Sequence, residues 1–110
     1  MVELWRKIEG WAYEVSNLGR VRHIVRKKVM CPRMRGSKGG RYPAVNLWEP
    51  GRMQTFSVHR LVAIAFLPNP KGCKEVHHKN GDKSDASAEN LCWCTRQENE
   101  LYKKIGRAHV

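Results

Sequence analysis

The first half of the chain consists of short segments in which β-branched and aromatic residues alternate with polar ones. Residues 13–16 and 21–30 have this alternation, and a turn that carries Asn and Gly separates them. Residues 42–48 and 53–58 repeat it on either side of a Pro-Gly turn, which is typical of a hairpin. The pattern therefore predicts a first half built from short strands and turns.

From residue 57 onward the apolar pattern changes to that of a buried helix. Ser57 suits an N-cap, and residues 58–67 are nearly all apolar. His59 and Arg60 are the polar exceptions in this segment. Pro68 follows and stops the helix, because proline cannot continue the hydrogen-bond ladder. We expect a helix over 58–67 that is buried on most of its surface.

Two short strands and a second helix are expected further along the chain. Residues 75–78 and 91–94 have the composition of strands, and a polar segment that begins with an Asn-Gly turn joins them. Thr95 and Glu98 have the spacing of a capping box. This motif predicts a helix from about residue 96 to about residue 105.

This order of elements indicates an α+β fold. We expect a small β-rich module over residues 1–56, and over residues 57–110 the apolar helix followed by a strand–loop–strand–helix core. A chain of 110 residues buries roughly 60–65% of its unfolded surface. That length excludes a large two-domain or barrel enzyme. In so small a protein the tryptophans are expected in the core: Trp5, Trp11, Trp48 and Trp93.

Positive charge is concentrated in one segment of the first half. The chain has 21 Lys and Arg against 10 Asp and Glu, a net charge of +11. Residues 20–41 contain no carboxylate, and such a segment repels itself unless a polyanion, most commonly nucleic acid, neutralises it. We expect its basic side chains to bind a nucleic-acid backbone: Arg20, Arg22, Arg26, Lys27, Lys28, Arg33, Arg35, Lys38 and Arg41.

No part of the sequence is typical of a membrane protein. The longest apolar run, residues 61–67, is far shorter than the ~20 residues of a membrane span. The basic segment is broken by Pro32 and several glycines, so it lacks the apolar stripe of an interfacial helix. The first residues show no apolar core before a small-residue cleavage site. We therefore expect a cytoplasmic protein with no membrane partner.

Four cysteines allow a second interpretation of the sequence, a zinc-organised binding module. In a chain of cytoplasmic character, Cys31, Cys73, Cys92 and Cys94 are expected to be thiols and not disulfides. No two of them have the C-x-x-C spacing of a zinc knuckle. A zinc-organised binding module that uses Cys73, Cys92, Cys94 and a histidine is therefore retained only as an alternative.

The residues best suited to chemistry lie in the strand–loop–strand–helix segment. His77 and His78 end the first strand, Asn90 precedes the second, and Asn99 falls in the first turn of the final helix. Neighbours in a strand point to opposite faces, so one histidine can bind a metal while the other transfers a proton. Packing of these elements would bring His77 and Asn99 within reach of one cation, such as Mg²⁺, which accepts amide oxygen ligands.

The sequence here resembles a known family. Residues 76–85, 89–95 and 97–99 look like the HNH endonucleases of the phage and intron-encoded homing type. Residues 5–22 are similar to the nuclease-associated DNA-binding module that often precedes such cores, and residues 59–70 match the connecting helix and linker. The resemblance implies a ββα-metal (HNH, His-Me finger) core after the β-rich module.

The resemblance also implies a role for each candidate residue. His78 matches the general base, and His77 matches a first metal ligand. Asn90 matches the middle residue of the motif, which steadies the loop and the base, and Asn99 matches a second metal ligand. Ala86 departs from the pattern, because Asn is frequent at this position, and we expect the change to loosen the loop before Asn90.

A metal-dependent DNA endonuclease is the function that the resemblance implies. It would hydrolyse phosphodiester bonds in double-stranded DNA with one divalent cation, Mg²⁺ or Mn²⁺, in the host cytoplasm if a phage encodes it. A monomer with one site would nick, whereas a two-fold homodimer would cut both strands, and the sequence leaves both open. The alternative is a non-catalytic DNA-binding protein that keeps the HNH fold.

Overall fold

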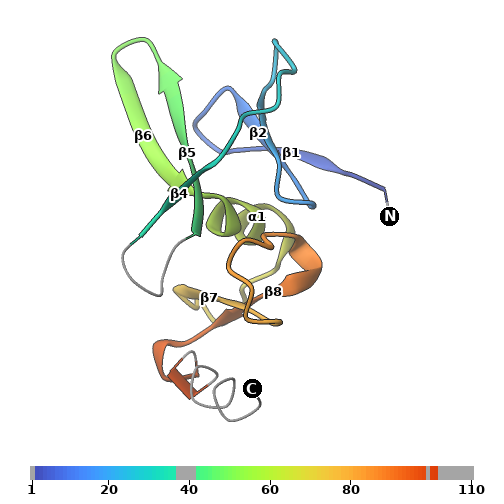
Figure 1. Cartoon of the computed structure of the whole chain (residues 1–110), viewed down its shortest axis with the longest axis vertical. Helices are drawn as coiled ribbons and strands as arrows, with labels where there is room; N and C mark the ends of the chain where they lie inside the picture. The colour runs from blue at the N-terminus through green and yellow to red at the C-terminus, as the bar shows by residue number, and fades with distance from the viewer. Residues whose placement is uncertain (1, 37–41, 99, 102–110) are drawn as a thin grey trace.

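The structure, a computed structural model, describes residues 2–36, 42–98 and 100–101. Within them the chain forms three small antiparallel sheets around a central helix (Figure 1). The elements in chain order are β1 (Trp5–Lys7), β2 (Tyr13–Ser16), β3 (Val21–His23), β4 (Arg33–Arg35), β5 (Tyr42–Glu49), β6 (Arg52–Ser57), α1 (Val58–Phe66), β7 (Glu75–His78), the 3-10 turn η1 (Ala88–Asn90) and β8 (Leu91–Cys94).

The first sheet has the order β1-β2-β3, with the most buried strand, β2, at its centre. The prediction of one strand over 21–30 is wrong beyond His23. Lys27 has a φ of 54°, a left-handed angle that is incompatible with a continuing strand. His23 also ends the strand, because its Nδ1 accepts a hydrogen bond from the backbone N–H of Val25 at 3.2 Å. The basic segment therefore starts as a strand and continues as turns and loop.

The second sheet has the order β4-β5-β6, and β5 and β6 form the predicted hairpin. The expected strands over 42–48 and 53–58 are confirmed, with shifts of a single residue at their ends. Gly51 in the connecting turn has a φ of +83°, which explains the glycine there. The tip of this hairpin extends away from α1 (Figure 1).

The tryptophans do not all lie in the core. Trp11 is 6% exposed and belongs to the core, whereas Trp5 and Trp93 are half-buried. The prediction is wrong for Trp48, which is 61% exposed. Trp48 pairs with the exposed Met53 on the outer face of the hairpin, so the alternation of the strand directs both side chains away from the core.

Helix α1 lies at the centre of the molecule, with the first two sheets on one side and β7–β8 on the other (Figure 1). Ser57 occupies the N-cap position, without a side-chain cap hydrogen bond. The helix ends at Phe66, because Leu67 is extended before Pro68. Both halves of the chain contribute to one core cluster: Ile8, Trp11, Tyr13, Val15, Val21, Val45, Leu47, Val58, Leu61, Val62, Ala86 and Leu91. The division of the chain at residue 56 stays a prediction.

The third sheet pairs β7 with β8, as expected from the sequence. The capping box is also confirmed: the N–H of Thr95 donates to Glu98 Oε1 and the N–H of Glu98 donates to Thr95 Oγ1, both at 3.1 Å. Residues 96–98 and 100–101 are helical, and the remainder of the predicted helix lies outside the described residues. Among the helices described, none is both long and apolar enough to span a bilayer.

Candidate active site

The two adjacent histidines lie at the end of β7. His78 is 8% exposed and pairs with Leu91, whereas His77 is half-buried and pairs with Cys92. Burial lowers the pKa of His77 and of His78, so both imidazoles are neutral at pH 7. A neutral imidazole can accept a proton or bind a metal ion. The two rings thus differ in burial, and the assignment of a separate role to each stays a prediction.

Asn90 fastens the loop that joins the two strands. Its Oδ1 accepts a hydrogen bond from the N–H of Asn80 at 3.0 Å, and its Nδ2 donates to the carbonyl oxygen of Asp85 at 2.9 Å. Its own carbonyl oxygen accepts from the N–H of Lys79 at 2.7 Å. The side chain is 9% exposed, so these bonds are protected from water. Asn90 therefore fixes the chain immediately after His78.

Residues of the N-terminal module contact the loop between β7 and β8. The N–H of Ala88 donates to the carbonyl oxygen of Asn17 at 2.7 Å. Gly19 approaches Ala86 so closely that a Cβ atom on Gly19 would lie 3.2 Å from the Ala86 carbonyl oxygen. Ala86 is only 6% exposed and is part of the core. The expected loosening is therefore not supported, because Ala86 fills the space beside Gly19.

A third histidine, His59, also belongs to this site. It lies in the first turn of α1, and its ring centroid is 4.9 Å from that of His78, with the planes at 66°. Burial lowers the pKa of His59 to about 4, and His78, Arg60 and Lys83 add to the effect. His59 is not among the site residues predicted from the sequence, although it is a polar exception in an apolar helix.

The predicted metal ligands are His77, which the structure describes, and Asn99, which lies outside the described residues. Within the described ranges, no three His, Cys, Asp or Glu side chains form a group that could hold a metal ion. Mg²⁺ keeps several of its waters and binds through one or two protein ligands. A neutral imidazole at the end of β7 therefore fits a site completed by an amide, water and phosphate oxygens.

The zinc alternative receives no support from the cysteines. Cys92 and Cys94 are on β8, and burial raises the pKa of both thiols, that of Cys94 to about 11. Zinc binds the thiolate form, which these environments disfavour in the absence of a metal. Together with Cys73 and the described histidines they form no metal-binding group.

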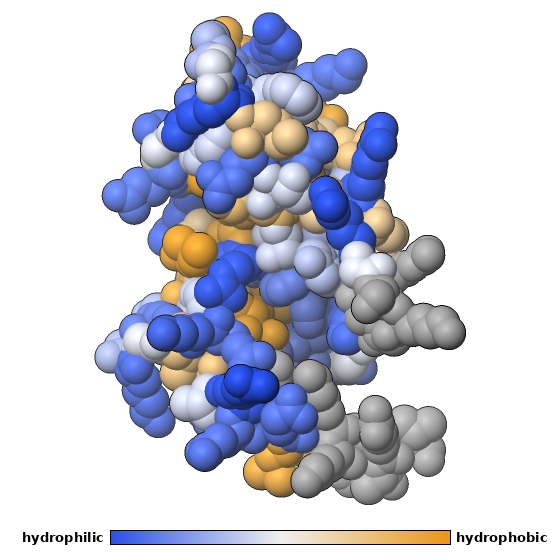
Figure 2. Space-filling view, turned by 90° about the vertical axis from the view of Figure 1, so that its left-hand side faces the viewer, coloured by the Kyte–Doolittle hydropathy of each residue, from blue (hydrophilic) through white to orange (hydrophobic). Residues whose placement is uncertain are grey.

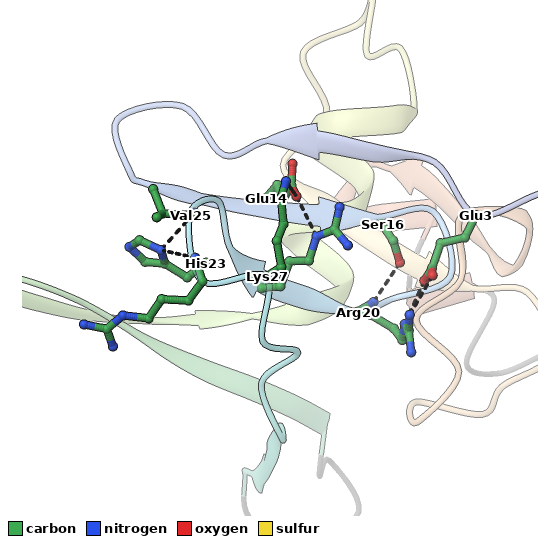
Figure 3. A network of polar contacts seen from close by, with 9 residues as sticks. Glu3, Glu14, Ser16, Arg20, His23, Val25 and Lys27 are labelled. Carbon is green, nitrogen blue, oxygen red and sulfur yellow. Dashed lines mark hydrogen bonds and ion pairs between the residues drawn. The ribbon is translucent and has the colours of Figure 1, made fainter.

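The first part of the basic segment is paired with carboxylates of the same module. Arg20 Nη2 lies 2.7 Å from Glu3, and Lys27 Nζ lies 3.2 Å from Glu14 (Figure 3). Arg22 Nε lies 2.6 Å from the same carboxylate of Glu14. The hydrogen bond from Arg20 lowers the pKa of Glu3. Burial opposes ionisation of Glu14, but the hydrogen bonds from Arg22 and Lys27 outweigh it and lower its pKa. These basic side chains are therefore partly neutralised within the module.

The later part of the basic segment faces solvent. Arg33 and Arg35 are exposed, at alternate positions of β4, so their side chains lie on one face of the sheet. No ion pair to another described residue holds either of them. Arg26 and Lys28 are exposed as well. Hydrophilic residues cover most of the face in Figure 2, and apolar atoms show only in small patches. Two predicted contacts lie outside the described residues: Lys38 and Arg41.

Two known families match consecutive parts of the chain. Residues 56–101 match the HNH endonuclease family, and residues 3–48 match the NUMOD4 motif. The chain thus carries an HNH endonuclease domain, and a NUMOD4 motif precedes it.

Its similarity to individual phage proteins is extensive. It is 37% identical to the DNA endonuclease I-HmuI of Bacillus phage SP01 over 86% of this chain and 54% of that protein. The H-N-H endonuclease F-TflII of Escherichia phage T5 is 32% identical over 89% of this chain and 50% of that protein. A solved structure of the HNH homing endonuclease I-HmuI superposes with a TM-score of 0.78 and 34% identity over 97% of this chain. The chain spans about half the length of these curated phage relatives.

Proposed function

We propose that this protein is a metal-dependent endonuclease that hydrolyses phosphodiester bonds in duplex DNA. The observation that carries the proposal is His78, a buried, neutral imidazole at a strand end, next to a loop that Asn90 fastens by three hydrogen bonds. An imidazole held in this way is suited to accept a proton from an attacking water. The relatives that are named endonucleases support the same reaction.

Each residue of the site then has a distinct task. His78 takes the proton from the water, and Asn90 keeps the backbone around His78 in place. His77 and Asn99 would hold one divalent ion, Mg²⁺ or Mn²⁺. When bound, this ion supplies charge neutralisation at the scissile phosphate and at the leaving 3′ oxygen. The products would carry 5′-phosphate and 3′-hydroxyl ends.

Duplex DNA is the proposed partner because the protein exposes basic side chains that can contact phosphates. Arg33 and Arg35 project from one face of β4 and can contact successive phosphates. Arg26 and Lys28 extend the positive surface. Contacts of this kind give affinity that falls steeply with salt. Since the relatives I-HmuI and F-TflII belong to phages, we propose that the protein acts in the host cytoplasm.

The test is cleavage of supercoiled plasmid with Mg²⁺ or Mn²⁺. We expect open-circle or linear product with the wild-type protein and none after addition of EDTA. His78→Ala should lower the cleavage rate by a factor of about a hundred or more, which is the usual contribution of a general base. His23→Ala is the matched control, because His23 lies at the end of β3, outside the site, and the change should leave cleavage unchanged.

Two results would contradict the proposal. Cleavage that persists in both EDTA and the His78→Ala variant would show that a different mechanism or a contaminant acts. Tight DNA binding without cleavage under any metal would favour the alternative, a non-catalytic protein that keeps the HNH fold. The ratio of open-circle to linear product separates nicking by a monomer from cutting by a homodimer.

A further inference from the structure

Three aromatic rings from different parts of the chain lie together at His78, the proposed general base. The ring of His59, in α1, lies between Tyr42 of β5 and His78 of β7. Its centroid is 5.6 Å from that of Tyr42, with the planes at 88°, and 4.9 Å from that of His78. His59 therefore has one neighbour in the N-terminal module (residues 1–56) and one in the nuclease segment (residues 57–110). Its orientation is fixed on two sides.

Two ring nitrogens in this group are buried without a hydrogen-bond partner among the described residues: His59 Nδ1 and His78 Nε2. A buried polar atom left unpaired costs about 1–3 kcal/mol, so native proteins rarely leave two of them on adjacent rings. A neutral imidazole has one donor nitrogen and one acceptor nitrogen. A single N–H on either ring can therefore satisfy both atoms.

We propose that His59 is a positioning residue for the reaction, and that its Nδ1 accepts a hydrogen bond from the Nε2–H of His78. The bond forms by a small rotation of the rings. It fixes the tautomer of His78 in which Nδ1 has the free lone pair. The inference rests on the proposed function, because that lone pair is the one that would take the proton from water.

The direction of the hydrogen bond follows from the role proposed for His78. If His59 Nδ1 donated instead, His78 would carry its hydrogen on Nδ1 and could not accept a proton there. His59 is suited to accept, because burial holds its pKa at about 4 and keeps it neutral. Its place in the first turn of α1 acts in the same sense, since the helix dipole disfavours a cation there. A hydrogen-bonded Nε2–H also stabilises His78 once it has taken up the proton.

The first test measures the tautomer of His78 in the whole protein without DNA or metal. Two-dimensional ¹⁵N–¹H spectra of histidine-labelled protein distinguish Nδ1–H from Nε2–H rings. We expect His78 in the wild type to be the Nε2–H form. His59→Phe keeps a flat ring but has no acceptor, so His78 should become a mixture of tautomers. His59→Gln supplies an amide oxygen and should restore the Nε2–H form.

The second test separates the rate of cleavage from DNA affinity. His59→Phe should lower kcat about tenfold to a hundredfold, the usual effect of losing an orienting partner, with the DNA dissociation constant unchanged. His59→Gln should recover much of the rate. His23→Phe, the same substitution on a histidine outside the site, is the control and should change neither quantity.

The results can also overturn the inference. A wild-type His78 in the Nδ1–H form, or one tautomer in all variants, would show that His59 does not set the tautomer. Equal kcat in wild type and His59→Phe would show that the bond has no role in cleavage. If the wild type fails to cleave DNA at all, the proposed function fails, while the spectra still decide whether the His59–His78 bond exists.

Discussion

The N-terminal module and the nuclease segment satisfy their polar side chains in different ways. The module uses ion pairs between residues distant in sequence, such as Glu3 with Arg20 and Glu14 with Arg22. Arginines of the module also cover aromatic rings: Arg22 lies 3.8 Å from the centre of the Trp5 ring. These contacts fix cations at the surface, where salt screens each pair and its contribution to stability is small.

The nuclease segment relies instead on short-range bonds from side chains to the backbone. Asn80 Oδ1 accepts from the N–H of Asp82, Asp82 Oδ1 accepts from the N–H of Ser84, and Asp85 Oδ1 accepts from the N–H of Ser87. Asx turns of this kind fix a loop without a large core. The N-terminal module therefore keeps its charged side chains at the surface. In the nuclease segment, single side chains instead fix the backbone of the loop beside the histidines.

The largest effect is expected from Asn90→Ala. The change leaves the N–H of Asn80 and the carbonyl of Asp85 without their partner, which should cost about 2–4 kcal/mol of unfolding free energy. Because the loop next to His78 loses its anchor, the cleavage rate should fall at least a hundredfold. Urea denaturation and plasmid cleavage measure the two quantities.

Asn69→Ala is the matched control for this prediction. The side chain of Asn69 makes two hydrogen bonds of the same kinds as that of Asn90, but to the backbone of Cys73. Its Nδ2 donates to the carbonyl oxygen of Cys73 at 2.7 Å, and its Oδ1 accepts from the N–H of Cys73 at 2.8 Å. It lies in the linker after α1, so its loss should lower stability but leave the rate of the folded protein near that of the wild type. Similar rate losses in both variants would contradict a specific role of Asn90.

Much of the fold and of the site could be predicted because the signals are local. Thr95 and Glu98, only three positions apart, define the capping box, and His77 and His78 are neighbours in one strand. The proximity of His59 to His78 could not be predicted, since it depends on how α1 packs against β7. The bend at Lys27 was missed because it depends on a backbone angle that composition does not reveal.

The second prediction concerns the contact between the two regions. Gly19→Ala places a Cβ atom 3.2 Å from the carbonyl oxygen of Ala86, at a φ of +87°. We expect a loss of about 1–3 kcal/mol in unfolding free energy and a several-fold lower cleavage rate, because the loop before Asn90 must shift.

Gly51→Ala isolates the backbone part of this effect. Gly51 has a similar φ of +83°, but a Cβ atom there would meet nothing within 4 Å. This variant should lose only about 1 kcal/mol, with no change in kcat. If the two variants behave alike in kcat, the module does not support the nuclease loop.

The third prediction compares the solvent-exposed arginines of the basic segment with those that are paired with carboxylates. If Arg33 and Arg35 each neutralise one phosphate, the double variant Arg33→Gln/Arg35→Gln should reduce the slope of log affinity against log salt by about 2. At physiological salt the DNA affinity should fall roughly tenfold. Arg20→Gln/Arg22→Gln removes the same charge from side chains already paired with carboxylates, so it should change the slope much less. Binding titrations at several salt concentrations, with an inactive His78→Ala background, provide the measurement. Equal slopes for the two double variants would show that the ion pairs open on DNA.

The smallest effect expected is the pH dependence of stability. Burial lowers the pKa of His59 to about 4, and the pKa values of His77 and His78 shift in the same direction. A group whose pKa is lower in the folded state gives full stability above its unfolded pKa, about 6.5, and loses it as the pH falls toward the folded value.

We therefore expect unfolding free energy to fall between pH 6.5 and pH 5, with a contribution from His59 on the order of 1 kcal/mol after allowance for solvent screening. The carboxylates Glu3, Glu14 and Glu49 have lowered pKa values too, so their contributions are lost only at lower pH, below about 4.5. The window from pH 7.5 to pH 5 thus reports on the histidines. His59→Phe should be less sensitive to pH there than the wild type. An identical pH profile for both proteins would mean that His59 is not held neutral by its burial against His78.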